Sequence, residues 1–387
     1  MSIPLAYNLR NLVVRRTTTI MTALGIALTV AVLLAVLGLV NGLRSTLAAS
    51  GDPLHVIVLR KGATSELTSI FQRSQYQDVK FKPGIARNSH GDPLVSVELV
   101  VLTELTNDAH PNGMNVTVRG LEPSGIEMRK NCKIVSGRWF QPGRRELVVG
   151  KQISNDYAEA RLGQKLRFGK GDWDVVGVFD ASGGAQSGEI WGDVNQLGSD
   201  FNRVENLSVA LVEAADPVTA QALMNDISND QRIGMAALSE KEYYAQQTQN
   251  GLPIEYTGIL VAIIMAVGSS FAAMNTMYAA VARRAREIGT LRVLGFSRGS
   301  ILVSFFIESV LLAGLGGLLG CLLALPLNAT TTSVGNANIS QTTFSFSVTP
   351  QTMAIGIIFA IFMGAIGGLF PAGNASRKEI LTALREV

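Results

Sequence analysis

Four long runs of apolar residues divide this chain, and each is long enough to cross a lipid bilayer as a helix. They occupy residues 17–43, 256–282, 301–327 and 353–375. About 20 apolar residues, rising 1.5 Å each, suffice to span the hydrocarbon core of a membrane. The pattern therefore predicts four transmembrane helices.

A polar region, about residues 44–251, separates the first two runs and shows the pattern of a folded domain. Residues 94–101 (LVSVELVV) and 114–120 (MNVTVRG) place an apolar side chain at every second position, the period of a half-buried strand. Other segments read as short strands or as helices, so we expect an α+β domain. Further strands are predicted at residues 55–60, 146–150, 165–169, 173–179 and 207–212, and helices at 65–74, 153–163 and 216–228.

Residues 239–250 (SEKEYYAQQTQN) form a polar, helical lead-in to the second apolar run. Gly251 and Pro253 interrupt this lead-in just before the run begins. Because proline removes a helix hydrogen bond, a hinge between the lead-in and the membrane helix is one prediction. Proline is also tolerated in the first turn of a helix, so Pro253 could equally mark the start of the membrane helix.

A short basic connector joins the second and third apolar runs. It holds an excess of arginine over acid, which is expected of a short cytoplasmic loop. Ile288, Leu291, Val293 and Leu294 recur near helical spacing with the arginines mostly opposite, which predicts a short amphipathic helix that ends at Gly295. Such a helix can lie against a partner. The charged residues are Arg283, Arg284, Arg286, Arg292, Arg298 and the single acid Glu287.

The charges beside the other apolar runs agree with this orientation. Arg10, Arg15 and Arg16 precede the first run, whereas residues 328–350, between the third and fourth runs, contain no charged residue. Since Lys and Arg gather on the cytoplasmic side, both ends of the chain are expected in the cytoplasm and the polar domain outside. The first run is too long for a signal peptide, although LAAS at residues 47–50 leaves cleavage open.

Polar and small residues inside the apolar runs carry further information. Glu308 is an intramembrane carboxylate, which is costly unless paired or hydrated, so it should face protein. It makes either a coupling or dimer contact near the inner leaflet or a structural hydrogen bond to a neighbouring helix. Glycines would let helices approach closely, within the protomer or at a dimer face. They are Gly314, Gly316, Gly317, Gly320, Gly364, Gly367 and Gly368.

Several short segments of the chain form a recognisable set. They are the intramembrane Asn275, RRAREIG at 283–289, LRVLGFSR at 291–298, ES at 308–309 and GGLLG at 316–320. Together they resemble the FtsX/MacB-type permeases of ABC transporters. Residues 9–31 and 367–387 extend the resemblance over almost the whole chain. Small departures from the usual pattern are Val293, where Ala is common, and Gly373 and Asn374, which interrupt an apolar-small run.

The resemblance implies an α-helical membrane protein with four transmembrane helices plus an α+β extracytoplasmic domain inserted between helices 1 and 2. Residues 1–43 would form the cytoplasmic N-terminus and helix 1. Residues 44–251 would form a MacB-like core domain with an inserted β-rich lobe at about 117–202. Residues 252–387 would form helices 2–4, with a cytoplasmic coupling helix at about 283–298 and an FtsX-like C-terminus.

The resemblance also implies partners and a coupling site. A permease of this kind sits in the bacterial inner membrane, pairs with a second permease protomer and two copies of a separate ATPase that binds ATP and Mg, and often works with a periplasmic membrane-fusion adaptor. We expect Leu291 and Leu294 to anchor the ATPase, and the arginines, Arg284 included, to form a rim where a loss costs about 1 kcal/mol or less. The implied coupling residues are Arg283, Arg284, Arg286, Glu287, Ile288, Gly289, Leu291, Arg292, Leu294 and Gly295, with a C-terminal cytoplasmic motif of Arg377, Leu384 and Arg385.

Missing motifs limit the chemistry. The sequence has no G-x-x-x-x-G-K-[ST] phosphate loop, no HExxH and no G-x-S-x-G, so we expect no catalytic, cofactor or metal site and no ATP hydrolysis by this chain. His55, His90 and His110 are scattered without ligand spacing. The net charge of +3 gives no nucleic-acid footprint, and Cys132 and Cys321 lie in dissimilar segments and are not expected to pair.

These observations are interpreted as the membrane permease subunit of an ABC transporter, which couples ATP hydrolysis elsewhere to extracytoplasmic motion for export or efflux. A lipoprotein-releasing (Lol-type) permease is the main alternative, and a division-type regulator of cell-wall hydrolases is a weaker one. A membrane-anchored enzyme or receptor would differ from all three by having no ATPase partner.

Overall fold

A computed structural model describes residues 14, 16–107, 111, 113–249, 252–336 and 339–377. The chain divides into two compact units, a helical unit (residues 1–42, 252–330 and 346–387) and an α/β unit (residues 43–251 and 331–345). The described part of the chain contains four helices that are long and apolar enough to cross a membrane. The predicted fold class, four transmembrane helices with an α+β domain inserted between the first two, is confirmed.

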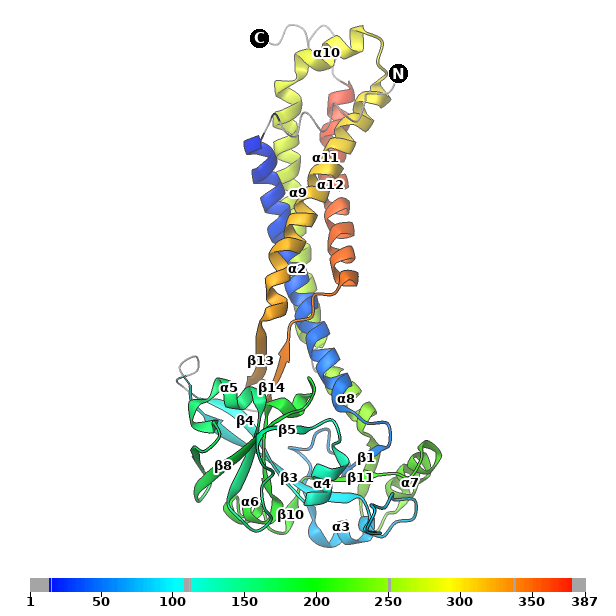
Figure 1. The fold of residues 1–387 in the computed structure, drawn as a ribbon. Helices are drawn as coiled ribbons and strands as arrows, with labels where there is room; N and C mark the ends of the chain where they lie inside the picture. Colours follow the sequence, from blue (N-terminus) through cyan, green and yellow to red (C-terminus); the bar gives the residue numbers. More distant parts are fainter. Residues whose placement is uncertain are drawn as a thin grey trace. The chain divides into compact units, whose positions relative to one another are not determined.

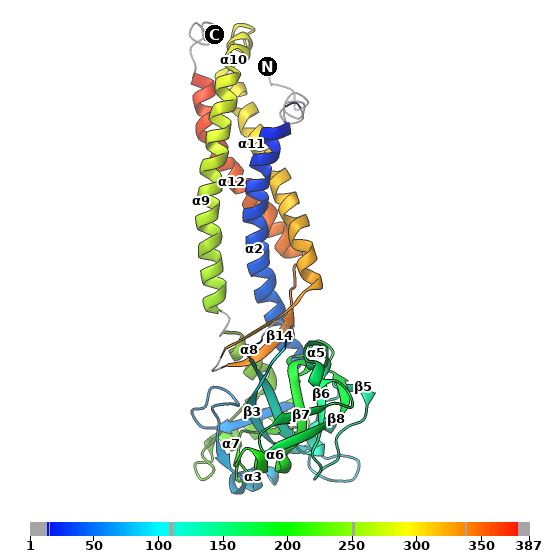
Figure 2. The same ribbon diagram turned by 90° about the vertical axis from the view of Figure 1, so that its left-hand side faces the viewer.

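In the helical unit the long helices run alongside one another in both views (Figures 1 and 2). A short helix lies at the end of this bundle, between the second and third spans. A 3₁₀ turn follows the third span. The elements are α2 (Arg16–Ser50), whose last residues belong to the α/β unit, α9 (Leu252–Arg283), α10 (Ala285–Val293), α11 (Arg298–Ala324), η3 (Leu325–Ala329) and α12 (Pro350–Arg377).

Glycines bring the spans into close contact. A Cβ added to Gly320 of α11 would lie 2.7 Å from the carbonyl oxygen of Ala27 in α2, and one added to Gly317 would lie 2.9 Å from the Cβ of Ala360 in α12. Tight packing within the protomer is therefore confirmed for most of the predicted glycines. It holds for Gly316, Gly317, Gly320, Gly364, Gly367 and Gly368, whereas a Cβ at Gly314 would meet nothing within 4 Å.

The second span shows where Pro253 belongs. α9 begins at Leu252, so Pro253 occupies its first turn, where a missing backbone N–H costs little. The polar lead-in forms α8 (Glu240–Gln249), as expected. Gly251, at which together with Pro253 the alternative placed a hinge, lies outside the described residues.

The α/β unit is built on one mixed sheet. Its strands are β1 (His55–Arg60), β3 (Val95–Leu105), β4 (Met114–Leu121), β5 (Lys133–Gly137), β6 (Glu146–Gly150), β7 (Lys165–Phe168), β8 (Gly171–Asp180), β9 (Glu189–Asp193), β11 (Val209–Glu213) and β12 (Met235–Ser239). Their order is β12-β1-β11-β3-β4-β9-β6-β8-β5, with β7 paired to β8. The pairs β4–β9 and β6–β8 are parallel and the others antiparallel. Every strand that the sequence pattern predicted is present.

Helix prediction in this unit succeeded in part. The helix expected at 216–228 forms as α7 (Pro217–Asn229), because the Asp216 carboxylate caps it by accepting from the amides of Val218 and Thr219 (both 2.9 Å). The segment expected at 153–163 holds only the end of one helix and a 3₁₀ turn. The remaining helices are α4 (Pro123–Met128), α5 (Lys151–Asp156), η1 (Ala158–Ala160), η2 (Ala185–Gly188) and α6 (Val194–Asp200).

The helix expected at 65–74 is wrong. Thr68 donates from both its amide and its hydroxyl to the carbonyl oxygen of Ser65, which closes a turn instead of a helix. β2 (Phe71–Gln72) then pairs with β10 (Asn206–Leu207), and α3 (Arg73–Lys80) starts only afterwards. Local side-chain bonding and a distant strand therefore override the helical pattern.

A buried ion network joins the central strands. The Arg119 guanidinium on β4 donates to Glu98 on β3 (2.7 Å), to Glu189 on β9 (2.8 Å) and to Glu66 (2.9 Å). Arg129 donates to Glu98 through both terminal nitrogens (2.6 and 2.9 Å). Burial alone would raise the pKa of the Glu98 and Glu189 carboxyls, but the two arginines outweigh it and hold both pKa values below their usual range. Both acids are thus ionised in the folded domain at neutral pH.

The uncharged loop between the third and fourth spans forms a hairpin that was not predicted. β13 (Thr331–Asn336) pairs antiparallel with β14 (Ile339–Ser345). Residues 331–345 belong to the same compact unit as the sheet. A loop predicted to be extracytoplasmic should belong to the α/β unit, and this one does.

Candidate coupling site

The basic connector folds as a helix between two turns. Arg284 has non-helical backbone angles (φ −106°, ψ 13°), so the chain turns there from α9 into α10. α10 ends as predicted, because Gly295 adopts a φ of +91° and its amide donates to the Arg292 carbonyl oxygen (3.2 Å). Ser297 then caps α11 by accepting from the amide of Ser300.

One side of α10 faces its own bundle. Ala285, Ile288 and Gly289 are buried, and Ile288 packs in an apolar cluster with residues of the spans, among them Met277 of α9 and Phe305 of α11. Ile288 and Gly289, both predicted as coupling residues, therefore seat the helix rather than face outward. Arg292 is half-buried and its guanidinium donates to the Phe296 carbonyl oxygen (3.4 Å).

The other side of α10 is an exposed surface of mixed character. Val293 and Leu294 are 64% and 65% exposed, although large apolar side chains usually lie inside. Leu291 is half-buried beside them. Arg286 and Glu287 are exposed on the same helix. Two exposed apolar side chains bordered by charges have the composition of a small docking surface, and Leu294, which the sequence analysis predicted as an anchor, is one of them.

Arg284 is not at the rim of this surface, and that prediction is wrong. Its side chain is 3% exposed and donates from Nη1 to Oε2 of the buried Glu308 (2.8 Å). The guanidinium also lies over the ring of Phe305, 5.7 Å from its centroid. Glu308 therefore faces protein, as expected, and its partner is the residue at which the connector leaves α9. The sequence could not reveal this pair, because it depends on the turn at Arg284.

The remaining predicted residues fall in different places. Arg283 is exposed at the end of α9, and Asn275 lies on an exposed face of the same helix. Arg377 is the last residue of α12. Leu384 and Arg385 lie outside the described residues. Of the predicted set, the structure brings together Arg284, Glu287 and Glu308, since Glu287 Oε2 lies 3.8 Å from Arg284 Nε.

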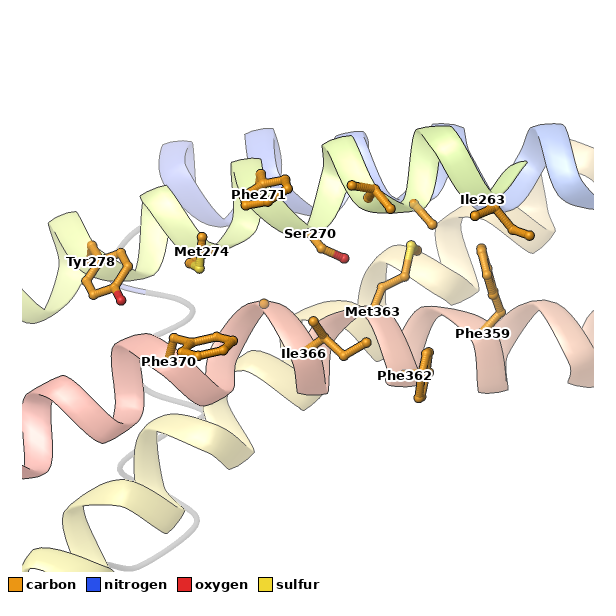
Figure 3. Close-up of a pocket in the computed structure, with 13 residues that line it drawn as sticks. Ile263, Ser270, Phe271, Met274, Tyr278, Phe359, Phe362, Met363, Ile366 and Phe370 are labelled. Carbon is orange, nitrogen blue, oxygen red and sulfur yellow. The ribbon is translucent and has the colours of Figure 1, made fainter. Parts of the chain in front are cut away.

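An apolar pocket between α9 and α12 was not predicted. Figure 3 shows side chains of the two helices facing each other across it, and its volume is about 680 Å³. Met274 of α9 lies across from Phe370 of α12, and Phe271 and Phe362 also line the pocket. Its lining, among the residues that the structure describes, includes no charged side chain, so it offers packing space rather than acid or base chemistry. Within the described ranges, no cluster of three His, Cys, Asp or Glu side chains could hold a metal ion.

The architecture defines a class: a multi-pass membrane protein with four spans, an α+β domain inserted between the first two, and an amphipathic helix between the second and third. Two family models match it. Residues 19–230 match the MacB-like periplasmic core domain, and residues 259–380 match the FtsX-like permease C-terminal domain. The chain belongs to this MacB/FtsX-like family of ABC transporter permeases.

Named relatives agree with this assignment. An uncharacterised ABC transporter permease, YknZ of Bacillus subtilis, is 26% identical over 292 residues, which cover 71% of each chain. The macrolide export ATP-binding/permease protein MacB of Pasteurella multocida is 26% identical over 369 residues, 86% of this chain and 55% of that protein. The chain thus spans only about half the length of that relative. Over 52% of this chain and 94% of the other, the periplasmic region of MacB from Actinobacillus actinomycetemcomitans superposes with a TM-score of 0.39 at 13% identity.

Proposed function

We propose that this chain is the non-catalytic permease subunit of an ABC transporter and that it couples ATP hydrolysis by a separate ATPase to movement of its extracytoplasmic domain. The observation that carries the proposal is α10. This helix is seated on the bundle by Ile288 and by the Arg284–Glu308 pair, yet it leaves Val293 and Leu294 exposed. Apolar anchors inside a charged rim are how docking helices commonly bind.

The arrangement suits transmission of force. α10 follows α9 with only Arg284 between them and is tied to α11 through Glu308, so a displacement of α10 acts on two spans at once. ATP and Mg would be bound by the partner ATPase, two copies of which would serve two permease protomers. The basic connector and both chain ends would lie in the cytoplasm and the α/β unit in the periplasm.

A second protomer has a candidate contact on α9. Asn275 lies on its exposed face, and a polar amide that faces hydrocarbon is costly unless it finds a hydrogen-bond partner. We propose that the partner protomer supplies one. Export or efflux of a substrate from the periplasm or outer leaflet, with an adaptor, is the function we favour. A Lol-type permease would use the same coupling helix, so what the external domain captures decides between the two.

The test is reconstitution. The purified chain alone should hydrolyse no ATP above background, and hydrolysis should appear when its cognate ATPase is added and should respond to the permease. Robust ATP turnover by a verified single-chain preparation would contradict the proposal. So would an ATPase that neither copurifies with the chain nor changes its turnover when the chain is present.

A further inference from the structure

The residues that follow α2 and the first turn of α8 meet in a buried polar contact inside the α/β unit. Glu240, the first residue of α8, is 2% exposed. Its Oε2 accepts from the backbone amide of Asp52 (3.0 Å) and lies 2.8 Å from Nδ1 of His55. Gly51 rests on the backbone of α8, where an added Cβ would lie 2.9 Å from the Cα of Lys241. The segment that brings the chain into this unit is therefore bound directly to the helix that takes it out.

The same contact reaches the other half of the sheet through η2. Ser50 Oγ accepts from the amide of Ala185 (2.8 Å), and the buried Gln186 side chain donates to the Tyr244 hydroxyl (3.3 Å). η2 leads directly into β9, which pairs with both β4 and β6. We call this set the α2–α8 junction. It comprises Ser50, Asp52, His55, Gln186, Glu240 and Tyr244.

Successive turns of α8 are bound beside the junction. The Tyr243 hydroxyl accepts from the amide of Glu66 (3.2 Å), and the Gln247 side chain donates to the Thr64 carbonyl oxygen (2.9 Å). α8 is thus fixed along its length to the segment after β1. In the first turn of α8, however, the Glu240 side chain binds the residues that follow α2, because its two contacts are to Asp52 and His55.

We propose that Glu240 is a positioning residue that makes the end of α2 and the start of α8 move as one body. Gln186 then passes that movement through η2 to the half of the sheet that contains β9. The use of this movement in transport rests on the proposed function, whereas the rigidity of the junction does not. A carboxylate suits the task because one of its oxygens serves a backbone amide and an imidazole together, and hydrogen bonds to an ionised acceptor are stronger than those to a neutral one.

The experiment measures the separation of two spin labels on the full chain in lipid nanodiscs. Cysteines at Ala49 and Gln246, both exposed, take the labels, and the native Cys132 and Cys321 are buried. The wild-type background should give one narrow distance distribution. Glu240→Ala should broaden it or split it into two populations, and Glu240→Gln, which keeps an acceptor oxygen, should restore it. Glu242→Gln, an exposed glutamate one position beyond Lys241, is the matched control and should change nothing.

A second variant keeps the test decisive if Glu240→Ala folds poorly. Gly51→Ala leaves Glu240 intact but places a methyl group against the Lys241 backbone, and it should broaden the same distribution. A narrow distribution in both folded variants would overturn the proposal, as would a wild-type separation that changes when ATP and the ATPase are added. The distance measurements without nucleotide need no ATPase, so they still test the rigidity of the junction if the proposed function is wrong.

Discussion

Arg284→Gln should destabilise the helical unit far more than any substitution of an exposed arginine in the same connector. The change removes the cation that faces Glu308, a pair whose side chains are 3% and 8% exposed. Removing one member of a buried ion pair typically costs about 3–5 kcal/mol, because it leaves a buried charge uncompensated. Arg283→Gln, one residue earlier and exposed, should cost about 1 kcal/mol or less.

The assay is a denaturant titration that measures the unfolding of each purified variant in one detergent. A cost of about 3 kcal/mol changes the folding equilibrium by a factor of about 100 or more. Replacing both partners by apolar residues, Arg284→Met with Glu308→Leu, should recover most of the loss, since apolar pairs often replace buried ion pairs without penalty. The recovery separates the ion pair from a general sensitivity of the site.

Two results would refute this reasoning. If Arg284→Gln and Arg283→Gln unfold at the same denaturant concentration, the pair contributes nothing measurable. If the double apolar variant is no more stable than Arg284→Gln alone, the loss comes from packing around Phe305 rather than from the unpaired carboxylate.

Other predictions concern separate parts of the chain. Leu294→Asp should abolish retention of the cognate ATPase in a pull-down by well-folded protein, whereas Arg286→Gln should retain it; normal retention by Leu294→Asp would remove α10 as the docking helix. Ser333→Cys should label from outside with an impermeant thiol reagent and Ser297→Cys only after the membrane is opened; the reverse pattern would invert the orientation. The pKa values of Glu98 and Glu189 are lowered in the folded domain, so the contribution of these carboxylates to the free energy of unfolding is complete above their unfolded pKa of about 4.3 and is lost as the pH falls below it. The melting temperature of the wild type should therefore drop through that pH range. The drop should be smaller in Glu98→Gln, measured beside the wild type at each pH. Ser270→Phe should fill part of the pocket between α9 and α12 and reduce ATP-driven movement without loss of ATPase binding, whereas Ala272→Phe on an exposed position of α9 should leave both unchanged.

Features that depend on local pattern were predictable from the sequence. The length of each apolar run predicts a span whatever its neighbours are. Gly295 could be recognised as a helix end because many helices end in the left-handed backbone conformation, which glycine adopts most readily. Alternation in 94–101 and 114–120 likewise predicted β3 and β4, since successive side chains of a strand point to opposite faces of its sheet.

Features that depend on distant partners were not predictable from the sequence. Arg284 looked like one more exposed arginine in a basic loop, and its burial follows from a turn whose angles no local motif announces. Residues 65–74 carry a helical pattern, yet Phe71 and Gln72 pair with Asn206 and Leu207, which lie far along the chain. Glu240 gave no signal either, because its partners at 52 and 55 are joined to it only through the folded sheet.

The contacts between the helices of the helical unit indicate which span would carry the proposed movement. α11 is seated on α12 by Gly317 and Gly364, where even a methyl group would collide, and such close packing resists sliding. Between α9 and α12, Gly367 makes one close contact, where an added Cβ would lie 3.0 Å from the Ser270 carbonyl oxygen, but the pocket leaves room beside Phe271 and Phe362. We therefore expect α9 to take up a displacement of α10 more readily than the α11–α12 contact does. In this proposal the Arg284–Glu308 pair, which lies between α9 and α10, would hold the point about which α9 turns.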